Sequence, residues 1–214
     1  MPQGGGESRA PRKRASRTAS GARRTRAHAA APREPITIAD DAHVVLVGLP
    51  GSGKTTVGLA LADVLDRLFL DFDHVIETRE GATVANIFAT HGEPRFRSME
   101  LELTREMVGG PGLVLAPGGG WAAIPGAVEL LCPPGIMVYL KVRPETAIAR
   151  LGRGKERGAR PLLAGPDPLG TLRSLLAERE LAYRRADLVV DAELVVDEVV
   201  TRIAGALAAP SLEG

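Results

Sequence analysis

The chain has 214 residues, of which 44% are hydrophobic, and this length suits one globular domain with a full core and is short for two. Its net charge is +1, but residues 1–35 hold nine basic side chains against two acidic ones, a net of +7, so the remainder sums to −6 and does not indicate a dedicated nucleic-acid-binding protein. The single cysteine, Cys132, excludes an intrachain disulfide and favours a reducing compartment, and no apolar run approaches the roughly 18 residues of a membrane span.

Residues 1–38 are rich in Arg, Ala, Ser, Gly and Pro, with no Leu, Ile, Val or Phe before Ile36. Such a segment cannot bury enough apolar surface to offset the entropy lost on ordering, so we expect a disordered basic leader and then one domain over residues 39–210. An inert or solubilising tail is the interpretation we favour. Non-specific polyanion contact and targeting are the alternatives, although a transit peptide needs an apolar helical face that this leader lacks.

Short apolar segments alternate with helical patterns from residue 43 onward. The expected strands are Val44–Val47, Leu68–Leu70, Leu113–Ala116, Ile136–Val142 and Leu188–Val190. The expected helices follow the loop at 48–56, lie between the second and third strands with a break at His91-Gly92, and cover about 144–151, 168–185 and 196–207. This alternation predicts an α/β fold with a parallel sheet covered by helices on both faces.

The segment Gly48–Thr56, GLPGSGKTT, fits the full phosphate-loop pattern and lies between a buried strand and a helix. Its glycines let successive backbone N–H groups face a β-phosphate, and the helix N-terminus adds its dipole. We expect Lys54 to span the β- and γ-phosphates and Thr55 to bind Mg2+. The predicted nucleotide-binding residues of this loop are Gly51, Ser52, Gly53, Lys54, Thr55 and Thr56.

The sequence also distinguishes between branches of the phosphate-loop proteins. Asn86 is the only asparagine and Ile87 follows it, so the Asn-Lys-x-Asp segment with which a GTPase recognises guanine is absent. The third strand ends in Pro117 and three glycines, whereas a motor-type ATPase would place an acidic residue there. Acidic residues instead follow the second strand, which favours a small-molecule kinase.

Two carboxylates, Asp71 and Asp73, stand in LDFD at the expected carboxyl end of the second strand, where open α/β sheets bind ligands. Their spacing of two predicts side chains that point the same way, so that one reaches Mg2+ through water and the other holds acceptor hydroxyls. A solvated strand end with a helix cap is the alternative. A metal cluster with His74 and Glu77 is disfavoured because no Cys or further His lies nearby.

The segment GEPRFRSMELE places Arg97 and Glu100 at i and i+3 on one helix face, where Glu100 can hold the guanidinium group so that it offers a planar fork to a carboxylate. A surface salt bridge is the alternative for this pair. Arg179, taken alone, is equally weak evidence for an anion-binding site. The glycines at 118–120 are more informative because backbone can approach a substrate closely there. Together these residues indicate a kinase for a small anionic polyol.

Six motifs, in order along residues 42–207, resemble those of the shikimate kinases. They are GLPGSGKTT, LDFD, Phe96-Arg97 with Glu100, the glycine triplet, RPLLAG at 160–165 and the segment Arg179–Tyr183. The resemblance implies a nucleoside-monophosphate-kinase-like phosphate-loop fold, with a five-stranded parallel sheet of order 2-3-1-4-5 and a lid. It implies transfer of the ATP γ-phosphate to the 3-hydroxyl of shikimate, on the way to chorismate and the aromatic amino acids.

The resemblance also implies roles for individual residues. It assigns Thr55 and Asp71 to Mg2+, Arg150 to adenine, and Arg160 to the phosphates once the lid has closed. Lys54, Asp73 and Arg160 would be the catalytic residues. The residues that it places on shikimate, with both arginines on the carboxylate, are Asp73, Arg97, Gly118, Gly119, Gly120 and Arg179.

Two features depart from the resemblance. Residues 152–160, GRGKERGAR, are longer and more basic than expected before Arg160, and we favour a mobile lid there over a solvated loop. Trp121 follows the triplet where a small residue is usual. It either packs beneath the glycine loop or floors the acceptor pocket, and packing is the interpretation we favour.

We therefore expect an ATP- and Mg2+-dependent shikimate kinase that is a cytoplasmic monomer without a specific nucleic-acid or membrane partner. A kinase for another small sugar acid, such as gluconate, is the nearest alternative. A non-catalytic protein that senses nucleotide or shikimate is an alternative of another class, although every charged group that phosphoryl transfer needs is present.

Arg160→Ala should lower kcat by orders of magnitude, because an arginine delivered by a closing lid acts mainly on charge that develops in the transition state. ATP affinity, measured without acceptor, should fall only modestly. Steady-state kinetics and nucleotide titration of the variant check both expectations. Normal turnover by Arg160→Ala would identify residues 152–163 as a solvated connection.

Overall fold

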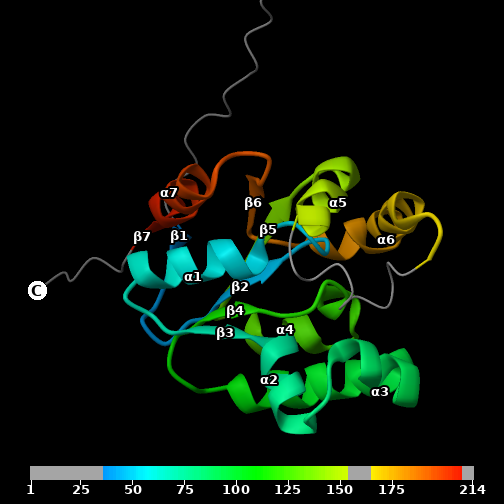
Figure 1. The fold of residues 1–214 in the computed structure, drawn as a ribbon. Coiled ribbons are helices and arrows are strands. Elements are labelled where there is room, and N and C mark those ends of the chain that lie inside the picture. Colours follow the sequence, from blue (N-terminus) through cyan, green and yellow to red (C-terminus); the bar gives the residue numbers. More distant parts are fainter. Residues whose placement is uncertain (1–35, 154–164, 209–214) are drawn as a thin grey trace, which may run out of the picture. The chain divides into compact units, whose positions relative to one another are not determined.

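The computed structural model describes residues 36–153 and 165–208, and its core is a parallel sheet (Figure 1). The sheet has five strands in the order β3-β4-β2-β5-β6. Their bounds are Val44–Val47 for β2, Phe69–Asp71 for β3, Val114–Ala116 for β4, Ile136–Lys141 for β5 and Leu188–Asp191 for β6. Counted along the chain this is 2-3-1-4-5, so the predicted sheet and strand order are confirmed.

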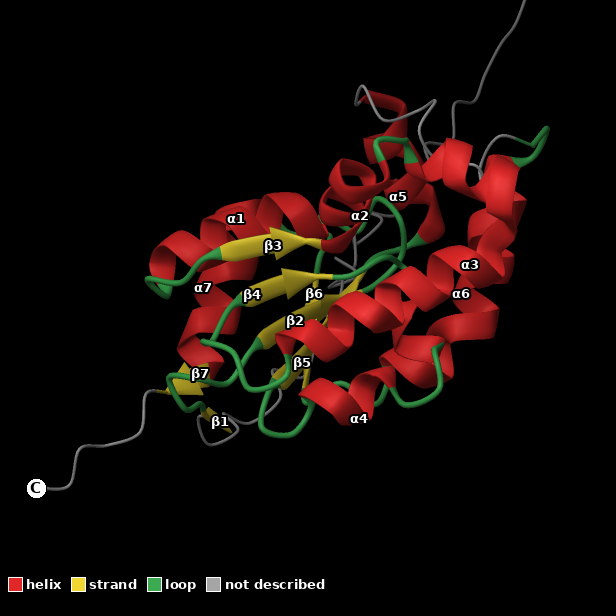
Figure 2. Cartoon of the chain, turned by 90° about the horizontal axis from the view of Figure 1, so that it is seen from below, coloured by secondary structure: helices red, strands yellow, loops and turns green. Residues whose placement is uncertain are grey.

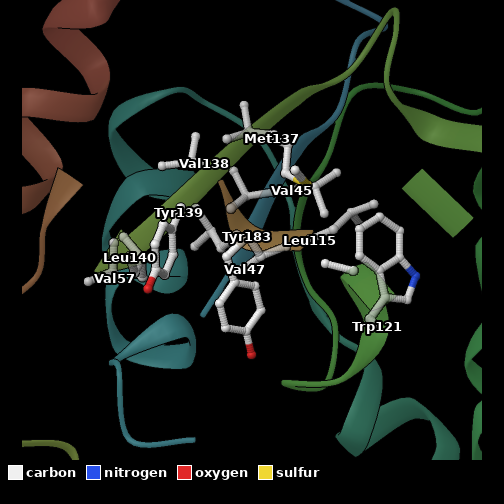
Figure 3. Close-up of a cluster of buried hydrophobic side chains, with 14 of the residues drawn as sticks. Val45, Val47, Val57, Leu115, Trp121, Met137, Val138, Tyr139, Leu140 and Tyr183 are labelled. Atoms are coloured by element: carbon white, nitrogen blue, oxygen red, sulfur yellow. The ribbon is translucent and has the colours of Figure 1, made fainter. Parts of the chain in front are cut away.

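The central strand β2 is buried along its whole length because β4 and β5 flank its two edges. Val45 is in register with Leu115 of β4 and Met137 of β5. Figure 3 shows these side chains in one apolar cluster with Tyr139 and Trp121. A continuous apolar run such as VVLV is typical of a parallel strand that is covered on both faces.

The described residues include seven α-helices around the sheet. Their bounds are Lys54–Val64 for α1, Phe72–Glu80 for α2, Val84–Met107 for α3, Ala127–Leu131 for α4, Pro144–Arg153 for α5, Pro168–Tyr183 for α6 and Val196–Ala206 for α7. Helices α1 and α7 pack together on one side of the sheet, and α3 and α4 lie on the other (Figures 1 and 2). Within the described ranges, none of the helices has the length and apolar character to cross a membrane.

Helix α3 is interrupted at Gly92, whose φ of 77° and ψ of 168° are not helical. Glycine adopts this positive φ at little cost, and Pro94 follows where a new helical segment begins. The break predicted at His91-Gly92 is therefore confirmed. It lets the segment that bears Arg97 and Glu100 take its own direction.

Two short strands that the sequence did not predict form a second, parallel sheet. Ile36–Thr37 (β1) pairs with Leu207–Ala208 (β7), and Ile38 beside them is buried. The predicted leader boundary at residue 38 therefore lies inside structure, because pairing with β7 and burial of Ile38 hold this segment. The rest of the predicted leader, residues 1–35, lies outside the described residues. The α4 helix and the 3-10 turn Trp121–Ala123 (η1) were also not predicted.

A chain that begins at Ala39 should be less stable than one that begins at Glu34, because only the longer chain keeps β1 and the buried Ile38. Burying an isoleucine side chain contributes about 1.5–3 kcal/mol, and losing Ile38 with β1 should lower the Tm by roughly 3–12 °C. Thermal unfolding of both truncated chains checks this. The full chain is the control and should melt with the chain that begins at Glu34, whereas equal melting of the two truncated chains would contradict the prediction.

Candidate functional site

The phosphate loop connects β2 to α1, and its backbone conformation requires glycine. Gly48, Gly51 and Gly53 have φ values of 146°, 80° and 97°. A Cβ at Gly51 would also lie 2.5 Å from the backbone oxygen of Ala147, because α5 packs directly against the loop. The N-cap residue of α1, Gly53, has no side chain to cap the helix, so the first amide groups of α1 face the loop without that competitor.

Lys54 bends back over the loop, where its Nζ donates to the backbone oxygens of Gly48 at 3.0 Å and Leu49 at 3.3 Å. Lys54 also lines a cavity of about 300 Å³. The cavity is lined by Gly51, Gly53, Lys54, Thr55, Thr56, Asp71, Asp73, Ala116, Pro117, Arg150 and Leu151. Eight of these residues were predicted from the sequence, and Ala116, Pro117 and Leu151 were not.

Asp71 connects the phosphate loop to the start of α2. Its Oδ2 accepts a hydrogen bond of 2.8 Å from the Thr55 hydroxyl, and its Oδ1 accepts from the backbone N–H groups of Asp73 and His74. Asp71 is thus both the end of β3 and the N-cap of α2, whereas Asp73 stands in the first helical turn. Both aspartates lie at the carboxyl end of the second strand as predicted, but the strand-like spacing of two does not apply to them because α2 begins at Phe72. Both residues line the cavity.

Glu77 and His74 are the residues of the metal cluster that the sequence disfavours. Glu77 instead accepts a hydrogen bond of 2.8 Å from the backbone N–H of Val84. Within residues 36–153 and 165–208, no group of three or more His, Cys, Asp or Glu side chains is arranged to hold a metal ion.

Arg97 is held by two carboxylates of α3. Its Nη1 contacts Glu100 Oε2 at 2.5 Å, and its Nη2 contacts Glu93 Oε1 at 2.5 Å. The Glu100 side chain has 0% exposure, so the alternative of a surface salt bridge is wrong for this pair. The structure adds Glu93, which the i, i+4 spacing to Arg97 would have indicated.

Burial is the main influence on the ionisation of this pair. The pKa of Glu100 is raised to about 7. Burial is the largest cause and the nearby charge of Asp73 also raises this pKa, while Arg97 and the amide of Gly118 lower it. Burial works to lower the pKa of Arg97, but the two glutamates more than offset it, so that pKa is raised. Arg97 therefore stays charged in a partly buried position, where it can bind an anion.

The glycine triplet lies against the charged side chains of the site. A Cβ at Gly118 would lie under 3.0 Å from Glu100 Oε1 and 3.2 Å from Asp73 Oδ1, and a Cβ at Gly120 would lie under 3.0 Å from the Arg97 guanidinium group. A Cβ at Gly119 would lie 3.5 Å from Arg179 Nη1. The triplet is therefore where the structure brings together the side chains predicted to bind the acceptor.

Helix α6 supplies Arg179, which is buried with 7% exposure, and Tyr183 one turn later. The Tyr183 hydroxyl donates to the backbone oxygen of Gly119, which fixes α6 against the triplet. Burial raises the pKa of Tyr183 to about 12, so the phenol keeps the proton that it donates. Tyr183 ends the last of the six sequence motifs, and its spacing of four from Arg179 places both on one face of α6.

Two further arginines and Trp121 complete the set of sequence predictions. Arg150 of α5 donates to the backbone oxygens of Ser52 at 3.4 Å and Ala192 at 2.7 Å, which places it beside the loop. Arg160 lies outside the described residues, as does most of the predicted lid. Trp121 is fully buried and does not line the cavity at the phosphate loop, and packing beneath the glycine loop stays the interpretation that we favour.

The sheet order, the phosphate loop and the glycine-lined charged cluster define a small-molecule kinase of the phosphate-loop class. A family model described as shikimate kinase matches residues 50–208. The chain therefore belongs to the shikimate kinase family.

Known proteins agree with this assignment. A shikimate kinase of Symbiobacterium thermophilum is 46% identical over 144 residues, covering 67% of this chain and 82% of that protein. One of Rhodopseudomonas palustris is 38% identical over 185 residues, covering 82% and 90%. The solved shikimate kinase of Acinetobacter baumannii in complex with shikimate is similar with a TM-score of 0.69 and 38% identity, covering 77% of this chain and 93% of that one.

The ionisation of Glu100 should make the protein less stable as pH rises. Because the pKa of Glu100 is about 7 when folded and near 4.5 when unfolded, the folded state binds more protons between these values. Its stabilising contribution is fully present below pH 4.5 and is lost as pH rises through about 7. The free energy of unfolding of the wild type, relative to Glu100→Gln, should therefore fall by roughly 3 kcal/mol across this range.

Urea denaturation of both proteins at several pH values between about 4.5 and 8 measures this difference. Glu93→Gln is the matched control. It removes the more exposed partner of Arg97 and keeps Glu100 buried, so it should retain the wild-type fall with pH. Parallel curves for the wild type and Glu100→Gln would show that Glu100 does not titrate in this range.

Proposed function

We propose that this protein transfers the γ-phosphoryl group of ATP to the 3-hydroxyl of shikimate. The observation that carries the proposal is the position of the glycine triplet against charged side chains. Gly118 lies against Glu100 and Asp73. Gly119 lies against Arg179, and Gly120 lies against Arg97. This arrangement gives a small anionic polyol two guanidinium groups and a carboxylate beside a phosphate loop. Membership of the shikimate kinase family and the shikimate complex of the relative from Acinetobacter baumannii support it.

At the nucleotide end, the loop residues 51–56 would bind the phosphates of ATP through backbone N–H groups and the positive end of α1. Lys54 would leave the carbonyl groups of Gly48 and Leu49 to bridge the β- and γ-phosphates. Arg150 would lie against adenine, because its hydrogen bonds hold it beside the loop. Arg160 would reach the transferring phosphoryl group from the segment after α5.

At the acceptor end, Arg97 and Arg179 would bind the carboxylate of shikimate. Arg97 is held rigidly by two glutamates, so little conformational entropy is lost when it binds. Asp73 would hold ring hydroxyls, with the backbone of Gly119 against the ring and Gly118 and Gly120 on either side. Bulkier residues at 118 or 120 would displace the charged side chains themselves.

The residues present fit Mg2+. Thr55 and Asp71 offer a hydroxyl and a carboxylate oxygen that already lie 2.8 Å apart, and Mg2+ usually takes one or two protein oxygens together with substrate phosphates and water. Thr55 and Asp71 would hold the ion, which supplies neutralisation of charge on the phosphates.

Phosphoryl transfer needs positioning and charge stabilisation more than covalent chemistry. Asp73 would orient the attacking hydroxyl and accept its proton as the bond from oxygen to phosphorus forms, while Lys54 and Arg160 stabilise charge on the transferring group. ADP leaves with the electrons of the broken bond. We further propose that the enzyme acts as a monomer in the cytoplasm.

Gluconate is the nearest alternative acceptor. A gluconokinase of Sinorhizobium meliloti shares the fold with a TM-score of 0.53, but at 16% identity that similarity extends to the fold alone. A non-catalytic sensor is disfavoured, because Lys54, Thr55 and Asp71 keep the arrangement that phosphoryl transfer requires. No observation favours either alternative over shikimate.

The decisive experiment measures ADP release with ATP and Mg2+ in the presence of shikimate, gluconate or no acceptor. Only shikimate should give turnover, and Lys54→Met should abolish it because the charge that bridges the phosphates is gone. Faster turnover with gluconate than with shikimate would show that gluconate is the better acceptor and would overturn the proposal. Absence of turnover with shikimate, in a protein that binds ATP, would favour the sensor.

Arg179→Lys should raise the KM for shikimate far more than the KM for ATP. Lysine keeps the charge but loses the two-pronged match to a carboxylate, at a cost of roughly 1.5–3 kcal/mol. The matched control is Arg173→Lys on the same helix, because Arg173 is exposed and pairs with Glu145. Steady-state kinetics with each substrate varied checks the prediction, and equal effects on both KM values would place Arg179 outside the acceptor site.

A further inference from the structure

Trp121 is the only tryptophan of the chain and directly follows the glycine triplet. It has 0% exposure, and Figure 3 shows its indole nitrogen turned away from the other labelled side chains of the core. That nitrogen donates a hydrogen bond of 2.8 Å to the hydroxyl of Thr104 on α3. The function proposed above gives Trp121 no role.

Trp121 belongs to a closed ring of hydrogen bonds between the triplet and α3. The Thr104 hydroxyl donates to the backbone oxygen of Glu100 at 2.6 Å. The Glu100 carboxylate accepts from the backbone N–H of Gly118 at 3.0 Å. The backbone N–H of Trp121 donates to the backbone oxygen of Gly118 at 3.0 Å, which closes the ring.

This ring links Trp121 to the groups proposed to bind the acceptor. Glu100, which belongs to this ring, also pairs with Arg97. Gly118, which donates to Glu100, is the first residue of the triplet. Trp121 Nε1 and Thr104 are both buried, so a shift of the triplet away from α3 would leave a buried indole N–H without its acceptor. Leaving a buried donor unsatisfied is costly, and the indole therefore resists such a shift.

We propose that Trp121 is a positioning residue for the acceptor site, which sets the distance between the glycine triplet and α3 through its bond to Thr104. The proposal rests on the proposed function, because it takes the triplet and Arg97 as the groups that bind shikimate. Trp121 does not touch the acceptor. It acts through Gly118 and Glu100, and its loss should loosen acceptor binding while leaving the nucleotide end intact.

Thr104→Val is the principal test, because valine has nearly the shape of threonine but cannot accept the indole proton. It should raise the KM for shikimate about five- to tenfold, with the KM for ATP unchanged within about twofold, since one lost hydrogen bond corresponds to roughly this factor. Thr104→Ser keeps the hydroxyl and should restore near-wild-type values. Trp121→Phe removes the donor and should raise the KM for shikimate to a similar degree.

Thr201→Val on α7 is the matched control. Thr201 also donates to the carbonyl four residues earlier, that of Asp197, at 2.7 Å, but it lies outside the ring. This variant should leave both KM values unchanged. If Thr104→Val and Trp121→Phe lower the Tm but leave the KM for shikimate unchanged, Trp121 is a core residue only and the proposal is overturned. Should Trp121→Phe fail to fold, Thr104→Val decides.

Hydrogen exchange at the Gly118 amide provides a second measurement that does not depend on turnover. This amide should exchange at least fivefold faster in Thr104→Val than in the wild type and Thr104→Ser, because the ring that holds it is broken. If the wild type does not phosphorylate shikimate, the proposed function fails, and the exchange rates still decide whether Trp121 holds the triplet. Equal exchange in all variants would overturn the positioning role.

Discussion

A carboxylate without solvent exposure lies between a guanidinium group and a backbone amide, and the acceptor end of the site is arranged around it. Glu100 pairs with Arg97 on its own helix and accepts a hydrogen bond from the backbone N–H of Gly118, which follows β4. Burying a carboxylate in this way is costly unless every oxygen has a partner. The backbone of the glycine triplet must therefore approach closely, and no residue with a Cβ allows that approach.

The two ends of the site are built by different means. At the phosphate loop the backbone does most of the work, since positive φ values at the glycines turn N–H groups inward and α5 packs directly on Gly51. At the acceptor end the binding groups are charged side chains, and the glycine backbone leaves the space that they occupy. The phosphate loop and the acceptor residues meet at the carboxyl ends of the parallel strands. Asp71 and Asp73 lie between these two parts of the site.

The sequence predicted the sheet, its order and the phosphate loop because these depend on local patterns and on a motif whose spacing is strict. It did not predict β1 and β7, because two-residue strands have no periodicity and form only through pairing across the chain. It applied strand spacing to Asp71 and Asp73 because a capping aspartate and a strand-end aspartate look alike before the helix start is known. Whether Glu100 is buried depends on what packs above α3, which spacing along one helix does not reveal.

The small sheet of β1 and β7 has a consequence for how the chain could be connected. Ile36 is in register with Leu207 and Thr37 with Ala208, so both ends of the described fold lie side by side, about 5 Å apart across the strand pair. A few linking residues could join them, and new ends could be opened at the exposed Gly109 between α3 and β4. In such a circular permutant the glycine triplet would stand near the first residue and Glu100 near the last. The hydrogen bonds from Gly118 to Glu100 and from Trp121 to Thr104 would then connect the first and last segments of the permuted chain.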